Sequence, residues 1–180
     1  MIYCFLAEGF EEVEALAAVD MIRRAGISLK TVGVGERLIC GAHGIKVECD
    51  CVCGEIVLDD SLQAVILPGG MPGTVNLEND ATVQKAIDFA AADGRLICAI
   101  CAAPSVLGHK GLLRGKEAIA YPGFEKELEG AEISEKYVVR DGNIITAKGA
   151  GVAIDFGLEI VSAVCGQDKA DEIRKAIQCR

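Results

Sequence analysis

The sequence contains few aromatic residues and few positive charges. Its 180 residues include three Tyr, five Phe and no Trp, and 18 Lys and Arg stand against 27 Asp and Glu, for a formal net charge of −9. Nucleic-acid-binding proteins use a basic surface to contact phosphates and aromatic rings to stack on bases. We therefore expect no nucleic-acid partner.

Long apolar runs are missing as well. No run approaches the ~18 apolar residues that a membrane span needs. Residues 1–7 are too short for the apolar segment of a signal peptide and include no basic residue. The nine cysteines are an odd number, which does not suit a disulfide framework. We expect no membrane association and a reducing, cytoplasmic location with free thiols.

Histidine is scarce, which limits the possible catalytic groups. The two histidines are His43, in a predicted side loop, and His109, near the end of a predicted helix whose dipole suits its charge. Neither directly follows a candidate nucleophile, so a Cys-His-Glu hydrolase triad is hard to build. No glycine-rich loop of the kind that binds nucleotides is present. Gly33 and Gly35 could begin one, but position 38, where the third glycine would stand, is Leu. We expect no nucleotide or other cofactor.

The remaining pattern alternates short apolar runs with amphipathic segments. It predicts strands over 1–7, 29–34, 64–67, 96–100 and 118–121, a side pair over 37–40 and 45–53, and a hairpin over 137–140 and 144–147. It predicts helices over 11–25, 80–92, 103–109, 152–164 and 168–177. This order is typical of an α/β fold, and we expect residues 1–180 to form one Rossmann-like, flavodoxin-like, three-layer sandwich with a mostly parallel sheet.

The segment LICAICAAP, residues 96–104, is the strongest candidate for a functional site. Its apolar half predicts a buried parallel strand, and Pro104 suits the first turn of a helix. Cys101 would then lie on a sharp turn at the carboxyl end of a central strand, where α/β sheets place their chemistry. The N–H groups of the helix start would favour its thiolate. A packed core cysteine is the alternative.

Two other strand ends would face the same edge of the sheet. The first is followed by Gly69 and Gly70, which let a backbone N–H approach a reacting atom as an oxyanion hole requires, although a simple tight turn is the alternative. The second is followed by three glutamates that could be a solvated helix start. Helical spacing predicts that Glu14 points inward and that Glu12 points away from the apolar stripe formed with Leu16. A buried Glu14 near the cysteine would have a raised pKa and could move a proton.

The other cysteines offer two further patterns. Cys98 and Cys101 form a C-x-x-C pair, but a mid-strand Cys98 would point to the opposite face, roughly 10 Å away, too far for a disulfide. Cys49, Cys51 and Cys53 alternate along one predicted strand. Without a neighbouring histidine we interpret them as strand positions and expect no metal site.

Five motifs in this order resemble the ThiJ/PfpI superfamily, of class I glutamine-amidotransferase-like fold, in the branch of Parkinson disease protein 7 and its bacterial ThiJ-type relatives. The resemblance covers essentially the whole chain. The motifs are AEGFEEVEA (7–15), MIRRAGI (21–27), VILPGGMPG (65–73), AICAAP (99–104) and KGAGVAIDFGLEIV (148–161).

The resemblance implies roles for four residues. Cys101 matches the family's oxidisable nucleophilic cysteine, and Glu14 matches the protonated glutamate that hydrogen-bonds to it. The backbone N–H groups of Gly70 and Ala102 match the oxyanion pocket. The resemblance also implies a homodimer, with glyoxalase III, deglycase, redox-sensing or chaperone activity.

Three positions depart from the superfamily's pattern. Tyr121 stands where many relatives have a histidine that assists proton transfer, and tyrosine is a poor base with a pKa near ~10. Ala102 stands where the peptidase-like branch has a histidine, which argues against a peptidase. His43 is nearest to the position of a side-loop arginine that many relatives carry.

These observations lead to three hypotheses. The first is an enzyme that converts small reactive carbonyls such as methylglyoxal to hydroxy acids through Cys101 and Glu14. The second is a non-enzymatic sensor of oxidative stress, in which the cysteine becomes a sulfinic acid. The third is an isomerase or hydratase acting on another small substrate, in line with the superfamily's label of thiazole monophosphate biosynthesis.

Overall fold

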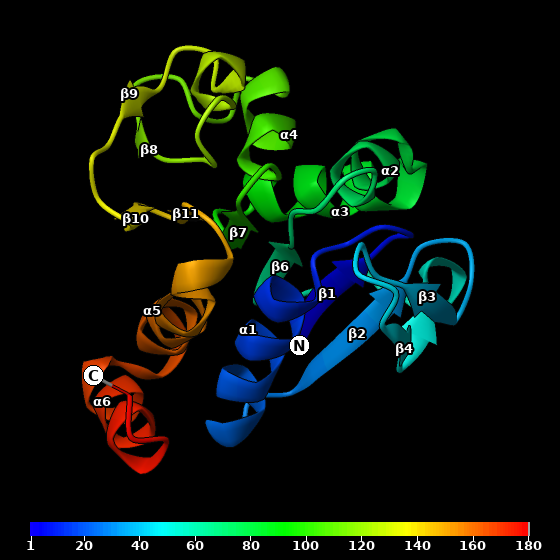
Figure 1. The fold of residues 1–180 in the computed structure, drawn as a ribbon, viewed down its shortest axis with the longest axis horizontal. Coiled ribbons are helices and arrows are strands. Elements are labelled where there is room, and N and C mark those ends of the chain that lie inside the picture. Colours follow the sequence, from blue (N-terminus) through cyan, green and yellow to red (C-terminus); the bar gives the residue numbers. More distant parts are fainter. Residues whose placement is uncertain (180) are drawn as a thin grey trace.

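The computed structural model describes residues 1–179, and its centre is a seven-stranded sheet (Figure 1). Neighbouring strands are parallel except β10, which is antiparallel to β11. The spatial order is β10 (Val138–Asp141), β11 (Ile144–Ala147), β7 (Leu96–Ile100), β6 (Ala64–Leu67), β1 (Ile2–Leu6), β2 (Leu29–Gly33) and β5 (Cys51–Val52). The five strands β2, β1, β6, β7 and β11 follow the flavodoxin-like order, which places ligand sites at the carboxyl ends of the strands.

Helices cover both faces of the sheet. One face packs against α1 (Glu12–Arg24) and α5 (Ala153–Cys165), with α6 (Gln167–Ala176) outside them. The other face packs against α2 (Gly73–Asn79), α3 (Ala81–Ala92) and α4 (Pro104–His109). Two small sheets, β3 (Leu38–Cys40) with β4 (Lys46–Glu48) and β8 (Glu117–Ala118) with β9 (Glu132–Ile133), lie beside the main one. Three short 3₁₀ segments span Cys53–Glu55, Glu125–Glu127 and Ala150–Val152.

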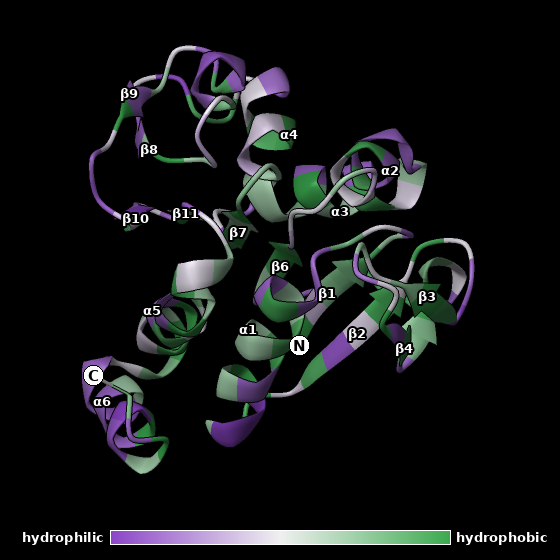
Figure 2. Cartoon of the chain, in the orientation of Figure 1, coloured by the Kyte–Doolittle hydropathy of each residue, from purple (hydrophilic) through white to green (hydrophobic). Residues whose placement is uncertain are grey.

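The apolar sequence runs account for this layering. Every residue of β1, β6 and β11 is buried, as expected for strands covered on both faces. Figure 2 shows β6 and β7 as hydrophobic and α6 as largely polar. Helices α1 and α5 approach closely at Gly157, where an added Cβ would lie 3.0 Å from the Cα of Ala18. The expected α/β three-layer sandwich is confirmed.

Several local predictions are confirmed. Strands β6 and β7 have the predicted bounds, and Asp80 caps α3 by accepting hydrogen bonds from the N–H groups of Thr82 and Val83, both at 2.9 Å. The hairpin turns at Gly142, whose φ is 61°. Helix α2 was not predicted, because its sequence follows a glycine- and proline-rich turn and has little helical periodicity.

The predicted strand over 118–121 is wrong. Only Glu117–Ala118 is extended, and it pairs with β9 outside the main sheet. The N–H of Ile119 donates to the side-chain hydroxyl of Thr146 at 3.0 Å. It therefore bonds to a side chain and not to the backbone carbonyl of a neighbouring strand.

The predicted single strand over 45–53 is also wrong. Asp50 interrupts it by accepting hydrogen bonds from the N–H and hydroxyl of Thr31, at 2.7 and 2.9 Å. The first half pairs with β3 and the second half joins β2. Cys49 therefore lies in the core on the α1 side, whereas Cys51 lies in the core on the α3 side, and the cysteines do not share one face.

No helix within residues 1–179 is long and apolar enough to cross a membrane.

Candidate active site

Cys101 lies on the sharp turn between β7 and α4, as predicted. Its φ is +65°, a left-handed conformation that costs a residue with a side chain on the order of 1–3 kcal/mol. Its N–H donates to the carbonyl of Ala147 at 2.9 Å, and its carbonyl accepts from the N–H of Tyr121 at 2.8 Å. These two bonds hold the strained backbone and leave the thiol half-buried above the sheet edge.

Glu14 points inward from the first turn of α1 and is 1% exposed. Its carboxyl group hydrogen-bonds to the thiol of Cys101 and accepts hydrogen bonds from the N–H groups of Gly69 and Ala150. The distance from the Gly69 nitrogen to Glu14 Oε2 is 2.9 Å. The structure thus brings the predicted cysteine and glutamate into direct contact.

Two further backbone N–H groups face the thiol, those of Gly70 and Ala102. They are the groups predicted to form an oxyanion pocket. The Cα of Gly69 lies against both side chains. A Cβ added there would lie 2.6 Å from the Cβ of Cys101 and 2.7 Å from Glu14 Oε2. The turn after β6 therefore needs glycine for close approach as well as for the φ of +92° at Gly70.

Burial shifts the ionisation of both reacting groups. Loss of hydration raises the pKa of Glu14 to about 7 despite the hydrogen bonds from Cys101 and Gly69, which lower it. Burial and then the negative charge of Glu14 raise the pKa of Cys101 to about 12, against the lowering effect of the Ala102 and Gly70 N–H groups. The N–H group of Ala102 at the helix start favours the thiolate, as predicted, but burial and the negative charge of Glu14 outweigh its effect. A protonated Glu14 has no charge and can donate a hydrogen bond to the sulfur.

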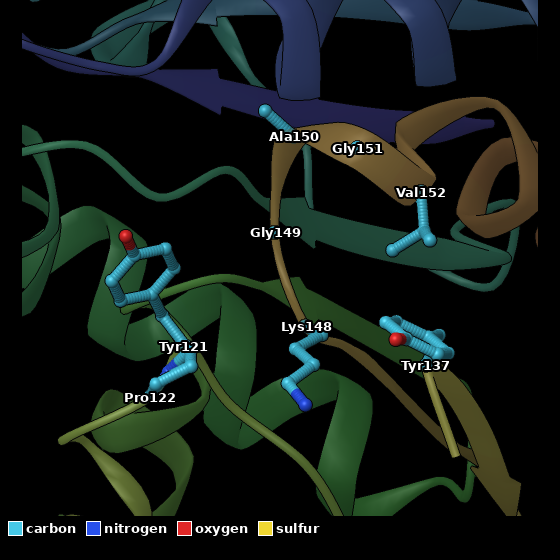
Figure 3. Close-up of a pocket in the computed structure, with 8 residues that line it drawn as sticks. All are labelled: Tyr121, Pro122, Tyr137, Lys148, Gly149, Ala150, Gly151 and Val152. Atoms are coloured by element: carbon cyan, nitrogen blue, oxygen red, sulfur yellow. The ribbon is translucent and has the colours of Figure 1, made fainter.

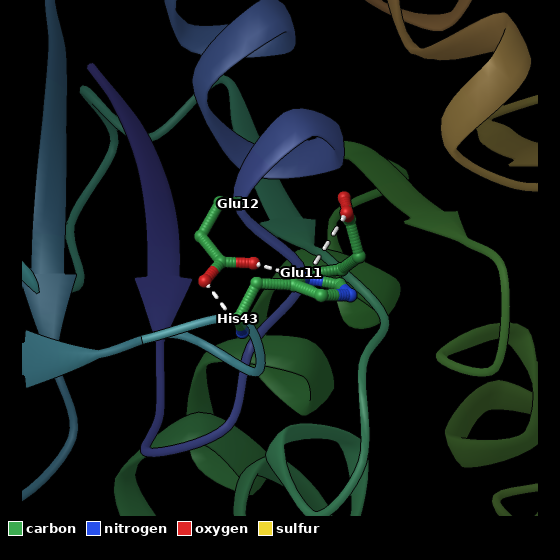
Figure 4. Close-up of side chains that lie close together, drawn as sticks. All are labelled: Glu11, Glu12 and His43. Atoms are coloured by element: carbon green, nitrogen blue, oxygen red, sulfur yellow. Dashed lines mark hydrogen bonds and ion pairs between the residues drawn. The ribbon is translucent and has the colours of Figure 1, made fainter. Parts of the chain in front are cut away.

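A second cluster lies beside the site, at the start of α1 (Figure 4). Glu12 Oε1 accepts from the N–H groups of His43 and Ile45, at 2.7 and 3.3 Å, and Glu12 Oε2 lies 2.8 Å from His43 Nδ1. Glu12 is 3% exposed because the loop that carries His43 covers it, so the alternative of a solvated helix start is wrong for this glutamate. The carboxylate ties the loop after β3 to the helix.

A metal site usually needs at least three His, Cys, Asp or Glu side chains close together. Within residues 1–179, one group has its possible metal-ligand atoms within 4.8 Å of one another, formed by Glu11, Glu12 and His43. Glu11 Oε2 also caps α1 by accepting from the N–H of Glu14 at 2.7 Å. Both carboxylates are therefore occupied by protein donors, which explains the cluster without a metal ion.

A pocket of about 410 Å³ opens beside the pair of reacting groups. Figure 3 shows Tyr121 and Tyr137 on either side of Lys148, and Ala150 at the far end of the same segment. Ala150 lines this pocket, and its N–H contacts the carboxyl group of Glu14, so the pocket wall and Glu14 meet at this residue.

Neither histidine contacts Cys101. His43 bonds to Glu12, and His109 bonds to Glu78 and Glu127 at 2.6 and 3.2 Å. The expected structural role of His109 at the end of α4 agrees with these contacts. No imidazole of the described residues is in place to act as a base for the thiol.

The sequence profile of the DJ-1/PfpI family matches residues 1–163. The chain belongs to the DJ-1/PfpI family. The predicted ThiJ/PfpI relationship is therefore confirmed.

Individual DJ-1 proteins are similar over nearly the full length of the chain. Drosophila melanogaster protein dj-1beta is 35% identical over 176 residues, which cover 96% of this chain and 93% of that protein. The solved structure of oxidised Toxoplasma gondii DJ-1 has a TM-score of 0.94 at 29% identity and covers 99% of this chain and 97% of that one. A Caenorhabditis elegans protein named glutathione-independent glyoxalase DJR-1.2 is 29% identical over 171 residues, which cover 94% of this chain and 91% of that protein.

Sequence reasoning missed two groups of this site, the N–H donors of Gly69 and Ala150. Gly69 was part of the turn that we singled out, but nothing in the sequence distinguishes the donor to Glu14 from its neighbour Gly70. Ala150 lies in the fifth motif, and only the fold brings it back to α1. Membership of the DJ-1/PfpI family supports a cysteine-based activity.

Proposed function

We propose that the protein is a glutathione-independent enzyme that converts small α-oxoaldehydes, such as methylglyoxal, to hydroxy acids. The observation that carries the proposal is the hydrogen bond between Cys101, on a strained turn, and the buried carboxyl group of Glu14. Hydrolysis of carbonyl adducts of amines, the deglycase reaction, would begin with the same attack. The name of the Caenorhabditis elegans relative supports the reaction class.

The proposed reaction needs one proton that the pair shares. With Glu14 protonated, the Cys101 thiolate attacks the aldehyde carbon, a C–S bond forms, and the carbonyl oxygen receives the electron pair. The N–H groups of Gly70 and Ala102 stabilise this oxyanion, which takes the proton from Glu14. The glutamate then moves the proton on the former aldehyde carbon to the adjacent oxo carbon through an enediol. Water cleaves the resulting thioester and releases the hydroxy acid.

Glu14 is suited to this shuttle because its pKa of about 7 allows it to give and take a proton near neutral pH. Tyr121 has its N–H bonded to the Cys101 carbonyl, and its side chain is 51% exposed. We therefore assign the proton transfers to Glu14 alone. The absence of an imidazole contact to Cys101 among residues 1–179 gives no support to a peptidase.

A sensor of oxidation is the second candidate, favoured by the solved oxidised Toxoplasma gondii relative. Two-electron oxidation steps by peroxide would convert Cys101 to a sulfinic acid. The N–H groups of Gly70 and Ala102 would donate to its oxygens, and a protonated Glu14 would donate a short hydrogen bond.

A homodimer is part of the proposal. Three apolar side chains near the start of α1 are exposed, Val13 by 55%, Leu16 by 37% and Ile45 by 54%. The bond from the Ile45 N–H to Glu12 places them at one end of the helix. A second copy of the chain would remove this apolar surface from water. We also propose a cytoplasmic location, because a nucleophilic thiol must remain reduced.

Replacement of the nucleophile tests the enzyme. Cys101→Ala should abolish conversion of methylglyoxal to lactate, measured without added thiol, whereas Cys165→Ala, at an exposed cysteine at the end of α5, should keep it. Full activity of Cys101→Ala would refute the enzyme. The sensor is tested by mild peroxide and mass spectrometry, and it fails if Cys101 stays reduced while the other cysteines react.

A further inference from the structure

The pocket beside the reacting pair has a cation in its wall. Lys148 directly follows Ala147, whose carbonyl accepts the N–H of Cys101, and it lies two residues before Ala150, which contacts Glu14. Two residues of extended chain span at most about 7 Å. The charge is thus carried by the same short segment that supports both reacting groups.

Lys148 is the charged residue of the pocket wall, and the other lining residues are uncharged. Its ammonium lies 5.1 Å from the centre of the Tyr137 ring, within the range of a cation–π contact. Among residues 1–179 no carboxylate forms an ion pair with it. The pKa of Glu125 is lowered chiefly by hydrogen bonds from the backbone N–H groups of Glu125 itself and Gly123. The charge of Lys148 adds a smaller lowering effect, so Glu125 is the nearby opposite charge.

A cation that forms no ion pair within the described residues is informative at this position. The chain carries a net charge of −9, and the reacting pair carries one negative charge when it shares one proton. An anionic substrate would be repelled unless a cation faced it. A lysine ammonium is a compact point charge, and a single one in an otherwise apolar wall suits a carboxylate with an aliphatic chain better than a phosphate, which usually takes several donors.

We infer that Lys148 binds a carboxylate at the far end of the substrate, so that the preferred substrates are α-oxoaldehydes that end in a carboxylate. This inference rests on the proposed carbonyl chemistry at Cys101. The aldehyde end lies at the thiol, the aliphatic chain lies along the walls formed by Tyr121 and Val152, and the carboxylate faces the ammonium near Tyr137. The pocket volume of about 410 Å³ lies in the range of small-molecule sites.

The reaction balances as for the neutral substrate. Cys101 adds to the aldehyde, Glu14 carries the proton from that carbon to the oxo carbon, and water hydrolyses the thioester. Dioxovalerate plus water then gives hydroxyglutarate, with the carboxylate at Lys148 unchanged. The aldehyde carbon is oxidised and the oxo carbon reduced, so no outside oxidant is needed.

Turnover of a matched pair of substrates is the first test. Wild-type protein should show a higher kcat/KM for dioxovalerate than for methylglyoxal. In Lys148→Met the ratio of these two values should fall roughly tenfold, as expected for one charged hydrogen bond, and Lys148→Arg should largely restore it. Lys175→Met, on α6, is the control and should keep the wild-type ratio. An unchanged ratio in Lys148→Met would overturn the inference.

Alkylation of Cys101 is the second test, and it does not depend on turnover. Iodoacetate is anionic and iodoacetamide is neutral. The rate of Cys101 alkylation by iodoacetate, divided by the rate with iodoacetamide, therefore reports the local charge, with the site assigned by mass spectrometry. The ratio should fall in Lys148→Met and stay unchanged in Lys175→Met. In wild-type protein it should fall as salt rises from about 0.02 to 0.5 M, a readout that needs no variant.

The two tests separate the possible failures. If neither substrate is converted but the alkylation ratio depends on Lys148, the proposed function fails and the anion site remains. If the alkylation ratio ignores both Lys148 and salt, the anion site is overturned whatever the activity. Inhibition by inorganic phosphate that exceeds inhibition by hydroxyglutarate would overturn the assignment to a carboxylate.

Discussion

Gly69 is the backbone position closest to both reacting side chains. A methyl group there would lie 2.6 Å from the Cβ of Cys101 and 2.7 Å from Glu14 Oε2, and it would be 3.0 Å from the carbonyl of Ile100. Real Cβ atoms do not approach so closely, so the Cys101–Glu14 contact would have to open.

We predict that Gly69→Ala lowers kcat/KM on methylglyoxal by at least about a hundredfold, the scale expected for a misplacement of about 1 Å. Circular dichroism should show an unchanged secondary structure. Gly54→Ala, at a glycine with open space around its Cβ position, is the matched control and should retain activity. Wild-type activity in Gly69→Ala would show that the close approach has no role in catalysis.

Glu14 links the chemistry to stability. Its folded-state pKa of about 7 lies above the ordinary value of 4.5, so its contribution to stability is full below pH 4.5 and is lost as pH rises through 7. Glu14→Gln has no such titration. We predict that above pH 7 this variant is more stable than wild type by about 2 to 3 kcal/mol.

Urea unfolding at pH 4 and pH 8 measures this difference. The two proteins should be similar at the lower pH and diverge at the higher one. If both proteins lose stability in parallel between these values, burial does not raise the pKa of Glu14 as described.

At the scale of elements, a buried glutamate joins a loop to a helix. Glu12 at the start of α1 binds His43, in the loop between β3 and β4. The hydrogen bond to Glu12 and the charge of Glu12 raise the pKa of His43 above 6.5. The contribution of His43 to stability is therefore full below pH 6.5 and is lost as pH rises through the raised pKa.

We predict that His43→Ala removes this part of the pH dependence. The difference in unfolding midpoint between wild type and His43→Ala should be largest near pH 6 and should shrink toward pH 9, measured by thermal unfolding at closely spaced pH values. Glu14 titrates in both proteins, so the difference isolates His43. A difference that is constant with pH would contradict the contact.

The elements also show what the sequence could and could not predict. Strands β6 and β7 were predicted to the residue because unbroken apolar runs bounded by turns have one interpretation in a covered sheet. Helix α1 was predicted from a stripe of five apolar residues, of which four are buried, Ala15, Ala18, Val19 and Ile22, whereas Leu16 is 37% exposed. Glu14 points inward as predicted, although part of the reason was wrong. Burial of Glu12 depends on a loop distant in sequence, which periodicity does not report.

At the scale of the whole molecule, the apolar side chains at the start of α1 bear on assembly. We predict that the wild-type protein sediments as a dimer at micromolar concentration and that Leu16→Asp sediments as a monomer, because a charge would have to be buried at the interface. Leu38→Asp, at another exposed apolar side chain outside this group, is the control. A wild-type monomer at all concentrations would contradict the homodimer.

The whole fold is what assembles the site. Cys101 follows β7, Glu14 lies in α1, the Gly69 and Gly70 turn follows β6, and Ala150 follows β11. The flavodoxin-like strand order brings these segments to one sheet edge. The sequence motifs predicted the residues, whereas the shared proton arises only from the burial that the assembled layers impose.

The titration of Cys101 tests the central claim, that Cys101 and Glu14 share a proton, most directly. We would measure its alkylation rate by iodoacetamide from pH 4 to 12 in wild type and Glu14→Gln. The account predicts that the wild-type rate rises in two steps, the first near pH 7 as the pair loses one proton, and that the variant shows a single step. A wild-type cysteine that is inert at neutral pH, or identical profiles in the two proteins, would contradict the account.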